Sequence, residues 1–553
     1  MSGEKQNIEQ NLAEEFKRSN SLREKENATQ SYIPQDDEEY NVTLKTWYVV
    51  MILALSYGIS FWIVPSLSSI QTTVATQLGY PTAAAFYISI YTTTVCWILL
   101  IEVRVCGANS DLFSRRSAKN NKAIMAACAL IGFGAGNAQL AAFALPELLP
   151  NKWRHSAIVL ADIGVYFAVV VGPVAGRFAG QHGEAWRWLF YAPAIAVAFS
   201  FAGLYLFYFP PKHPRGLPFD QALRELDYVG AILFISPATL ILTGIVYTTT
   251  LPSSNPKVIG TLVSGFCLLV VFALYETFAP LKQPLTPTHV FTRGGGRELT
   301  APFVAGFVVT MFYYAINVIY PTMIAVFFTN ETTSFRYGII LTLPQNLGLT
   351  FGAVLLTLFG ITIMVVFGAL VALGTPDRKA MMIAFVFLAE MGFGWGQYLS
   401  IAFIQFGVDQ VELGISGGLA GVARFAGGAV AISVYTTILT NVQSSQAVKL
   451  VPAAAIAAGP PASSAKSLLA ALPLGSAALA KVPGITTEIA VAAGKAFQQS
   501  YVVGLRTTAL SSLSFRIIRT IACICCNDIG HKMNDKIEIF LENDENADRN
   551  KYH

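Results

Sequence analysis

Charged residues are scarce in this chain, because Asp, Glu, Lys and Arg make up only 13% of its 553 residues. A soluble domain of this size carries roughly 25% charged residues, so the low value excludes an ordinary water-soluble protein. The hydrophobic share is 54% and the mean hydropathy is +0.52, which indicates a polytopic membrane protein. The net charge of +4 is too small to indicate a nucleic-acid partner.

Motifs for enzyme chemistry are also lacking. There is no phosphate-binding loop of the G-x-x-x-x-G-K-S/T type, so the sequence shows no ATP-binding site of that kind. The six histidines are scattered without an H-E-x-x-H pair, and no G-x-S-x-G occurs. The seven cysteines show no spacing typical of metal ligands. We therefore expect no enzymatic activity, no cofactor and no metal.

Long apolar runs fill most of the chain. A helix needs about 20 apolar residues to cross a bilayer, and these runs are too continuous for the alternating strands of a membrane barrel. The sequence therefore predicts an all-α membrane protein with about 13 spans, near residues 46–70, 81–105, 123–149, 155–177, 186–209, 228–249, 257–279, 300–328, 336–358, 359–374, 379–405, 411–440 and 502–525.

The segments between and beyond these runs differ in composition. Residues 1–45 are polar and acidic, which predicts a disordered cytosolic tail. Residues 441–500 are rich in Ala, Pro and Ser, and we expect a long external loop with short helical pieces. Residues 527–553 are polar again and predict a second cytosolic tail. Asn330 begins an N-E-T sequon in a short loop that the span count places outside, so it is a predicted glycosylation site.

One motif resembles a loop of the major facilitator superfamily. Gly107, Asp111, Arg115 and Arg116 follow the pattern G-x-x-x-D-x-x-G-R-R found between helices two and three, with Ser114 at the usual second glycine. The resemblance implies a cytosolic gate, in which the Asp caps a helix and pairs with basic groups while the first Gly allows two helices to approach closely. The latch holds the cytosolic side shut and breaks when that side opens.

A second motif resembles the antiporter signature on helix five of the same superfamily, G-x-x-x-G-P-x-x-G. It comprises Gly164, Gly172, Pro173 and Gly176 in the stretch G-V-Y-F-A-V-V-V-G-P-V-A-G. Small residues at helical spacing let helices pack closely in a membrane, and a proline adds a kink that neighbouring helices must satisfy. In that superfamily the motif is associated with exporters rather than importers.

Together with L-I-G-F-G-A-G-N-A-Q, P-E-L-L-P-N-K-W-R and the ending D-I-G-H-K-M-N-D-K-I-E, these motifs resemble the fungal trichothecene efflux pump family. That family belongs to the fourteen-helix drug:proton antiporters and is similar to siderophore transporters. The resemblance implies a major facilitator fold, in which two pseudo-symmetric helical bundles are joined by a linker with two extra helices and followed by a last helix. The two bundles correspond to residues 46–209 and 300–440, the linker with its two helices to 210–299, and the last helix to 501–526.

The same resemblance implies the function and its setting. We expect proton-driven export of a hydrophobic fungal metabolite, toxin or drug across the plasma membrane or the vacuolar membrane. The expected partners are a small hydrophobic substrate, protons and the lipid bilayer, with the chain acting as a monomer. A siderophore–iron transporter is the alternative within this superfamily.

The chain departs from the family pattern after Arg116. The residues S-A-K-N-N follow directly and resemble the loop after helix three, so we expect helix three to be missing. The charges also indicate a missing helix. Basic residues flank the run 123–149 at both ends, and positive residues favour the cytosolic side, but a single span cannot place both of its ends there. A faulty gene model and a genuine thirteen-span variant both explain this pattern. A membrane protein without transport activity therefore remains a further alternative.

Charged residues inside membrane spans are functional candidates. Glu390 lies in the middle of a span and is the first candidate for proton coupling, since a carboxylate removed from water can bind and release a proton near neutral pH. Asp162 and Arg424 are further candidates, and a structural pair between Glu390 and Arg424 is the alternative. Arg516 and Arg519 interrupt the last span and should face the bundle interior or a water-filled cavity.

Aromatic and amide side chains within the later spans predict a substrate cavity. A mainly apolar cavity with a few polar groups suits an amphipathic ligand, whereas single aromatic residues also occur at the lipid interface. The predicted cavity residues are Tyr313, Tyr314, Asn317, Tyr320, Gln345, Asn346, Trp395 and Gln397, with Tyr57 and Trp62 from the first span as additional members.

Overall fold

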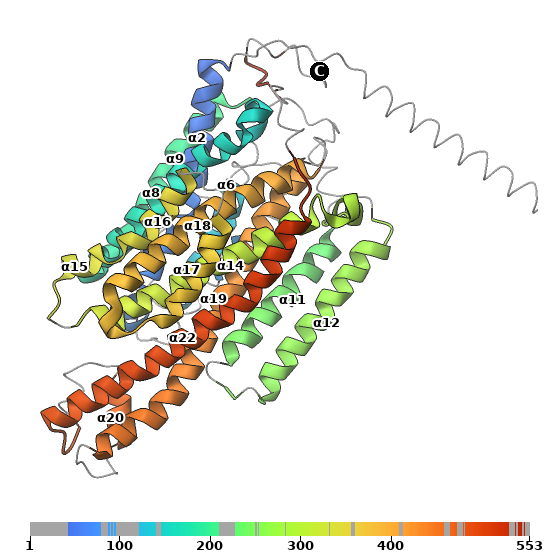
Figure 1. Cartoon of the computed structure of the whole chain (residues 1–553). Coiled ribbons are helices and arrows are strands. Elements are labelled where there is room, and N and C mark those ends of the chain that lie inside the picture. The colour runs from blue at the N-terminus through green and yellow to red at the C-terminus, as the bar shows by residue number, and fades with distance from the viewer. Residues whose placement is uncertain are drawn as a thin grey trace, which may run out of the picture. The chain divides into compact units, whose positions relative to one another are not determined.

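The computed structural model describes residues 42–547 apart from 79–86, 89, 92, 96–120, 140–144, 210–226, 249–250, 253, 282–283, 331, 355–359, 409–412, 458–464, 473–478, 480–481, 530–536, 538–539 and 545–546. The predicted N-terminal tail and the gate motif at 107–116 lie outside the described residues, as does the place where helix three is expected to be missing. Every regular element in the described ranges is a helix (Figure 1).

The first half of the chain forms four helices of 17 residues or more and several shorter ones. They are α2 (Leu44–Ser60), α3 (Ile63–Ser68), α4 (Gln71–Gln77), α6 (Asn121–Gln139), η2 (Leu145–Leu148), η3 (Asn151–Trp153), α8 (Arg154–Gln181), η4 (Gly183–Arg187) and α9 (Trp188–Phe207). Thr43 caps α2, since its side chain accepts a hydrogen bond from the Thr46 amide at 3.3 Å. Proline is tolerated inside α8 and α9 at positions 173 and 193.

Two helices, α11 (Tyr228–Tyr247) and α12 (Pro256–Phe278), lie side by side between the halves of the sequence (Figure 1). Asp227 caps α11 and Asn255 caps α12, each through a side-chain oxygen that accepts a backbone N–H. Their apolar outer surfaces are widely exposed, which suits contact with lipid. These two helices match the extra pair expected in the linker.

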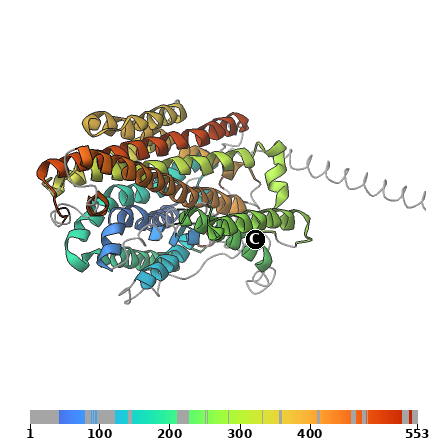
Figure 2. The same cartoon turned by 90° about the horizontal axis from the view of Figure 1, so that it is seen from below.

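The second half contains the remaining long helices. Its elements are α13 (Thr288–Thr292), η5 (Arg293–Gly296), α14 (Thr300–Met323), η6 (Ile324–Phe328), α15 (Phe335–Ile340), α16 (Leu343–Val354), α17 (Gly360–Leu370), η7 (Val371–Leu373), η8 (Pro376–Arg378), α18 (Lys379–Phe406), α19 (Leu413–Ala457), α20 (Ala465–Ala471) and α22 (Thr487–Cys525). Seen from below, the blue-to-teal helices gather on one side and the yellow-to-red helices on the other (Figure 2).

Within the described ranges, nine helical segments are long and apolar enough to cross a membrane, and the shorter segments Ile124–Gly136 and Thr362–Leu373 are also apolar. Helices occupy twelve of the thirteen expected runs, while 81–105 lies largely outside the described residues. The predicted all-helical membrane fold is thus confirmed.

The structure differs from the sequence interpretation at residues 441–500. We expected a loop with short helical pieces, but α19 continues unbroken through Ala457 and α22 already begins at Thr487. Alanine has the highest helix propensity, and Pro452 is accommodated inside α19. The ends of α19 and α22 pack with α20 around a separate apolar core, whose buried members are Ala447, Val451, Ala455, Leu468, Ala471, Val482, Ile489 and Ala493 (Figure 1).

Candidate functional site

Glycines bring α2 and α8 into direct backbone contact. A Cβ atom on Gly58 would collide with the backbone of Gly164, and a Cβ atom on Gly164 would lie 2.9 Å from the Gly58 Cα atom. Small residues permit this approach within a membrane. The crossing fixes the position of Tyr57, which precedes Gly58, and of Asp162, which lies two residues before Gly164.

Tyr57 forms a polar link between the two halves of the chain. Its hydroxyl accepts a hydrogen bond of 2.5 Å from the Arg424 Nη1 atom on α19, and it also interacts electrostatically with Asp162 on α8. Asp162 is fully buried, and the Arg424 guanidinium lies 4.3 Å from the centre of the Phe61 ring. An acid, a phenol and a base from three helices therefore meet in the interior.

Glu390 occupies a different environment on α18. Its side chain is fully buried, and neither carboxylate oxygen has a hydrogen-bond partner among the described residues. The proposed structural pair with Arg424 is therefore not formed. Two close helix contacts flank this position, because Gly348 and Gly352 of α16 pack against the backbone of Phe387 and Met391. The carboxylate is held at a rigid helix crossing, where a charge is costly to bury.

Tyr313 lies between these two groups. It interacts electrostatically with both Glu390 and Arg424, and its ring stacks on Phe393 at a centroid distance of 4.9 Å. Tyr314 also interacts electrostatically with Arg424, and its ring contacts the backbone at Gly428. Tyrosines of α14 thus connect the bridge at Arg424 with the carboxylate of α18.

Several predicted cavity residues are buried in the second half. The Thr310 hydroxyl donates to the Gln397 Oε1 atom at 3.2 Å, and the Asn317 side chain donates to the Tyr313 carbonyl at 2.9 Å. Gln345 and Asn346 are buried on α16. Trp395 is half-buried, on the same helix as Gln397. The structure thus places all these groups on α14, α16 and α18.

Two other aromatic residues that were predicted to line the cavity hold helices together in this structure. The Tyr320 hydroxyl donates to the Leu341 carbonyl at 2.6 Å, and the Trp62 Nε1 atom donates to the Leu189 carbonyl at 3.0 Å. Both bonds tie helices together through backbone groups.

The antiporter motif lies along the first two helices. Gly172 faces Pro65 and Ser66, and Gly176 packs so closely on Ser66 that any side chain there would collide. Pro173 lies within α8 without ending the helix. Together with Gly164, the motif glycines therefore form the contact surface of α8 with α2 and α3.

Arg519 is buried on α22, as expected for an arginine that interrupts a span. Its Nη1 atom lies 3.0 Å from the Met364 sulfur, and its guanidinium packs against Gly396 of α18. It also interacts with Cys523 one turn further along.

The role of Tyr57 as a bridge was missed, because the sequence alone does not show which phenol meets Asp162 and Arg424.

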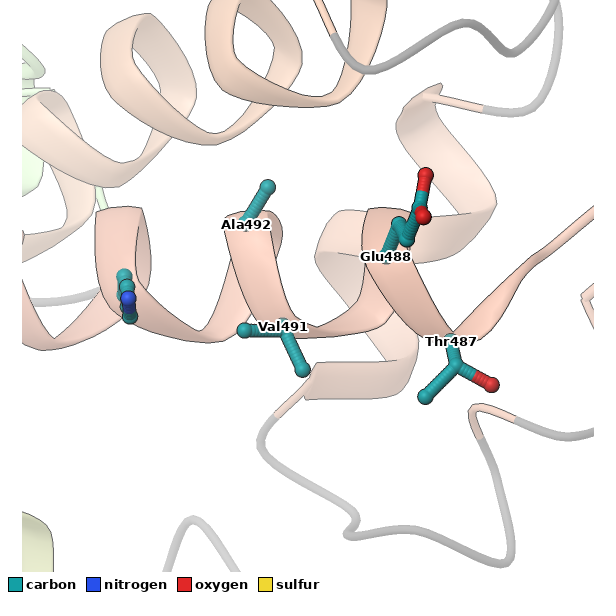
Figure 3. Close-up of a pocket in the computed structure, with 5 residues that line it drawn as sticks. Thr487, Glu488, Val491 and Ala492 are labelled. Carbon is teal, nitrogen blue, oxygen red and sulfur yellow. The ribbon is translucent and has the colours of Figure 1, made fainter.

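A shallow depression at the beginning of α22 is lined by Thr487, Glu488, Val491, Ala492 and Lys495 (Figure 3). Glu488 and Ala492 point to one side of the helix and Thr487 and Val491 to the other, and none of these residues belongs to the predicted cavity. The described ranges contain no group of three His, Cys, Asp or Glu side chains that could hold a metal ion.

The fold matches that of membrane transporters. A solved POT family transporter in complex with 5-aminolevulinic acid superposes with a TM-score of 0.50 at 12% identity, over 87% of this chain and 96% of that chain. MFS-type transporter prx5 of Penicillium rubens is 43% identical over 512 residues, which cover 90% of this chain and 93% of that protein. The class is therefore that of major facilitator transporters.

A model of the fungal trichothecene efflux pump (TRI12) matches residues 97–553. The trichothecene efflux pump TRI12 of Fusarium sporotrichioides is 22% identical over 528 residues, covering 88% of this chain and 87% of that protein. The chain belongs to the fungal trichothecene efflux pump family, which confirms the resemblance found in the sequence.

Proposed function

We propose that this protein is a proton-coupled exporter of a hydrophobic fungal metabolite, toxin or drug. The observation that carries the proposal is the Glu390 carboxylate, which is fully buried and has no hydrogen-bond partner among the described residues. Burying such a group in charged form costs several kcal/mol. Glu390 therefore takes up a proton before the site closes around it and releases the proton when the site opens to the cytosol.

The Tyr57 bridge supplies the link to the movement of the halves. It joins α2 to α19 through Arg424 and involves Asp162 of α8, so it spans the two halves that rock in an alternating-access transporter. Protonation of Asp162 would remove the negative charge that faces Tyr57 and Arg424. The bridge then weakens and the halves separate, while Tyr313, Tyr314 and the buried amides of the second half contact the substrate.

Direction and coupling are tested in proteoliposomes with an imposed pH gradient. A radiolabelled trichothecene is the export probe, and a ferric hydroxamate siderophore is the probe for the alternative importer. We expect proton-driven trichothecene flux toward the side corresponding to the cell exterior. Glu390→Gln should lower the gradient-driven flux at least about tenfold, because the amide cannot carry a proton.

Glu276→Gln is the matched control. Glu276 is also a buried carboxylate, but its oxygens accept hydrogen bonds from the amides of Leu285 and Thr286 at 3.3 and 3.0 Å. The Glu276→Gln substitution should leave the dependence of flux on the pH gradient unchanged in the correctly folded fraction of the variant. Equal gradient dependence in Glu390→Gln and the parent would refute the carrier role. Siderophore flux in the opposite direction would establish the alternative function.

A further inference from the structure

The C-terminal tail returns to the beginning of α2. The carboxylate of Asp544 accepts hydrogen bonds from the hydroxyls of Thr43 and Thr46 at 2.6 and 2.7 Å. The first turn of α2 contains no acidic residue of its own. A negative charge near a helix N-terminus is stabilising, because it faces the positive end of the helix dipole. The tail therefore supplies a charge that α2 lacks.

The same tail segment also contacts the end of α9. The Glu542 amide donates to the Phe209 carbonyl at 2.9 Å, and the Asn543 side chain donates to the Phe207 carbonyl at 3.4 Å. The last carbonyls of a helix have no partners within the helix, so these donors satisfy groups that would otherwise need water. Lys45 adds a bond of 2.8 Å to the Asn543 carbonyl.

Apolar contacts support the polar ones. Leu541 is fully buried within the main core, and Ile537 is 6% exposed. Burying such a side chain stabilises the folded chain relative to leaving it exposed to water. Residues 540–544, which we name the tail clasp, therefore contribute a buried apolar side chain to the main core in addition to their hydrogen bonds with the first half.

The beginning of the tail is attached to the second half. The Asn527 amide donates to the Arg297 carbonyl at 3.4 Å, and the Arg297 Nε atom donates to the Cys525 carbonyl at 3.1 Å. Arg297 precedes α14, and Cys525 ends α22. The tail is thus anchored to the second half at 525–527 and to the first half at 541–544.

We propose that the tail clasp is a releasable tie that holds this end of the two halves together. The end in question holds the beginning of α2 and the end of α22, and it is the one expected to face the cytosol. The inference rests on the proposed alternating access, because an exporter must separate its halves on this side to load substrate. Release of Asp544 from Thr43 and Thr46 then becomes part of opening, and the clasp sets how often the closed state opens.

The proposal is tested by distance measurement, which does not depend on transport. Spin labels are placed at Tyr205 of α9 and Ile524 of α22, which are 75% and 74% exposed, in full-length protein whose native cysteines are replaced. The distance distribution is recorded by pulsed electron paramagnetic resonance in lipid nanodiscs. Asp544→Ala should increase the long-distance population about threefold or more, and Asp544→Asn should give a smaller increase in the same direction.

Glu488→Gln is the matched control, since it removes an exposed carboxylate from the other end of α22. It should leave the distribution unchanged. A distribution in Asp544→Ala that superimposes on the parent and on this control would overturn the clasp. A shifted distribution in Asp544→Ala, together with unchanged proton dependence in Glu390→Gln, would retain the clasp and refute the proposed coupling.

Discussion

Tyr57 and Arg424 join the two halves of this transporter through one hydrogen bond of 2.5 Å. The bond connects α2 with α19, and the same phenol interacts with Asp162 of α8. Asp162 and Arg424 thus both interact with the neutral side chain of Tyr57, whose hydroxyl can donate and accept hydrogen bonds at the same time. Rotation of one half against the other must break or rearrange this contact.

Removal of the Tyr57 hydroxyl should uncouple the halves. We expect Tyr57→Phe to lower gradient-driven flux at least about tenfold while the protein still folds, because the ring is retained and only the bridge is lost. Flux in proteoliposomes and thermal unfolding are measured together. Tyr320→Phe is the control, since that hydroxyl bonds only the Leu341 carbonyl among the contacts described for it. A similar loss in both variants would argue against a specific bridge.

The glycine crossing of α2 and α8 should not tolerate a side chain. Gly58→Leu would force the two backbones apart, and overpacking of this kind costs roughly 1–3 kcal/mol or more. We expect a lower midpoint of thermal unfolding and a smaller monodisperse fraction in size-exclusion chromatography. Gly260→Leu is the control, because a Cβ atom there meets nothing within 4 Å. Equal stability of the two variants would contradict the crossing.

Gly396 provides the space that the Arg519 guanidinium occupies. We expect Gly396→Ala to lower the unfolding midpoint by a few degrees, since the methyl group collides with a buried side chain. Arg519→Met should restore most of that loss in the double variant, because a shorter apolar side chain leaves room and removes a buried charge. If Gly396→Ala lowers the unfolding midpoint equally with Arg or Met at position 519, the two positions do not interact.

The thiol of Cys526 should react slowly with maleimide. Burial raises its pKa to about 11, and the neighbouring Cys523 and Cys525 add to the shift. The group is therefore protonated at pH 8, with roughly a thousandth present as thiolate, and its labelling rate should rise about tenfold per pH unit up to pH 10. A single cysteine introduced by Asp528→Cys at an exposed position is the comparison. Equal rates at pH 8 would contradict a raised pKa of the partly buried Cys526 thiol.

Asn330 remains a predicted glycosylation site. It is exposed, and its side-chain oxygen accepts hydrogen bonds from Thr332 and Thr333 at 2.8 and 2.6 Å. We expect a glycosidase-sensitive band shift for the protein made in a fungal host and none for Asn330→Gln. An unshifted parent band would place this loop away from the glycosylation machinery, against the expected topology.

The helical membrane fold was predictable because apolar runs of about 20 residues have one stable solution in a bilayer. The family was predictable from motifs whose glycines, such as Gly164 and Gly176, then proved to be helix contacts. The Ala- and Pro-rich segment was misinterpreted as a loop, because tertiary packing of α19 on α22 outweighs local proline signals.

The candidate site was predictable only in part. A charged residue within an apolar run is visible in the sequence, so Glu390, Asp162 and Arg519 could be singled out. Their partners were not visible, because a contact such as that of Thr46 with Asp544 joins positions 498 residues apart. Sequence periodicity cannot predict a contact between such distant positions. The pairing of Arg424 with Tyr57 likewise became visible only in the three-dimensional structure.

The unbroken course of α19 and α22 has a mechanical consequence. At 1.5 Å per residue, 45 and 39 residues give rods of about 68 and 58 Å, longer than a bilayer is thick. A tilt of either helix would therefore also move the small apolar core that the ends of α19 and α22 form with α20. Because residues 441–500 are expected outside the cell, we expect an antibody fragment raised against that core to report the transport cycle from that side, and one that immobilises the core to stall transport without contacting the substrate path.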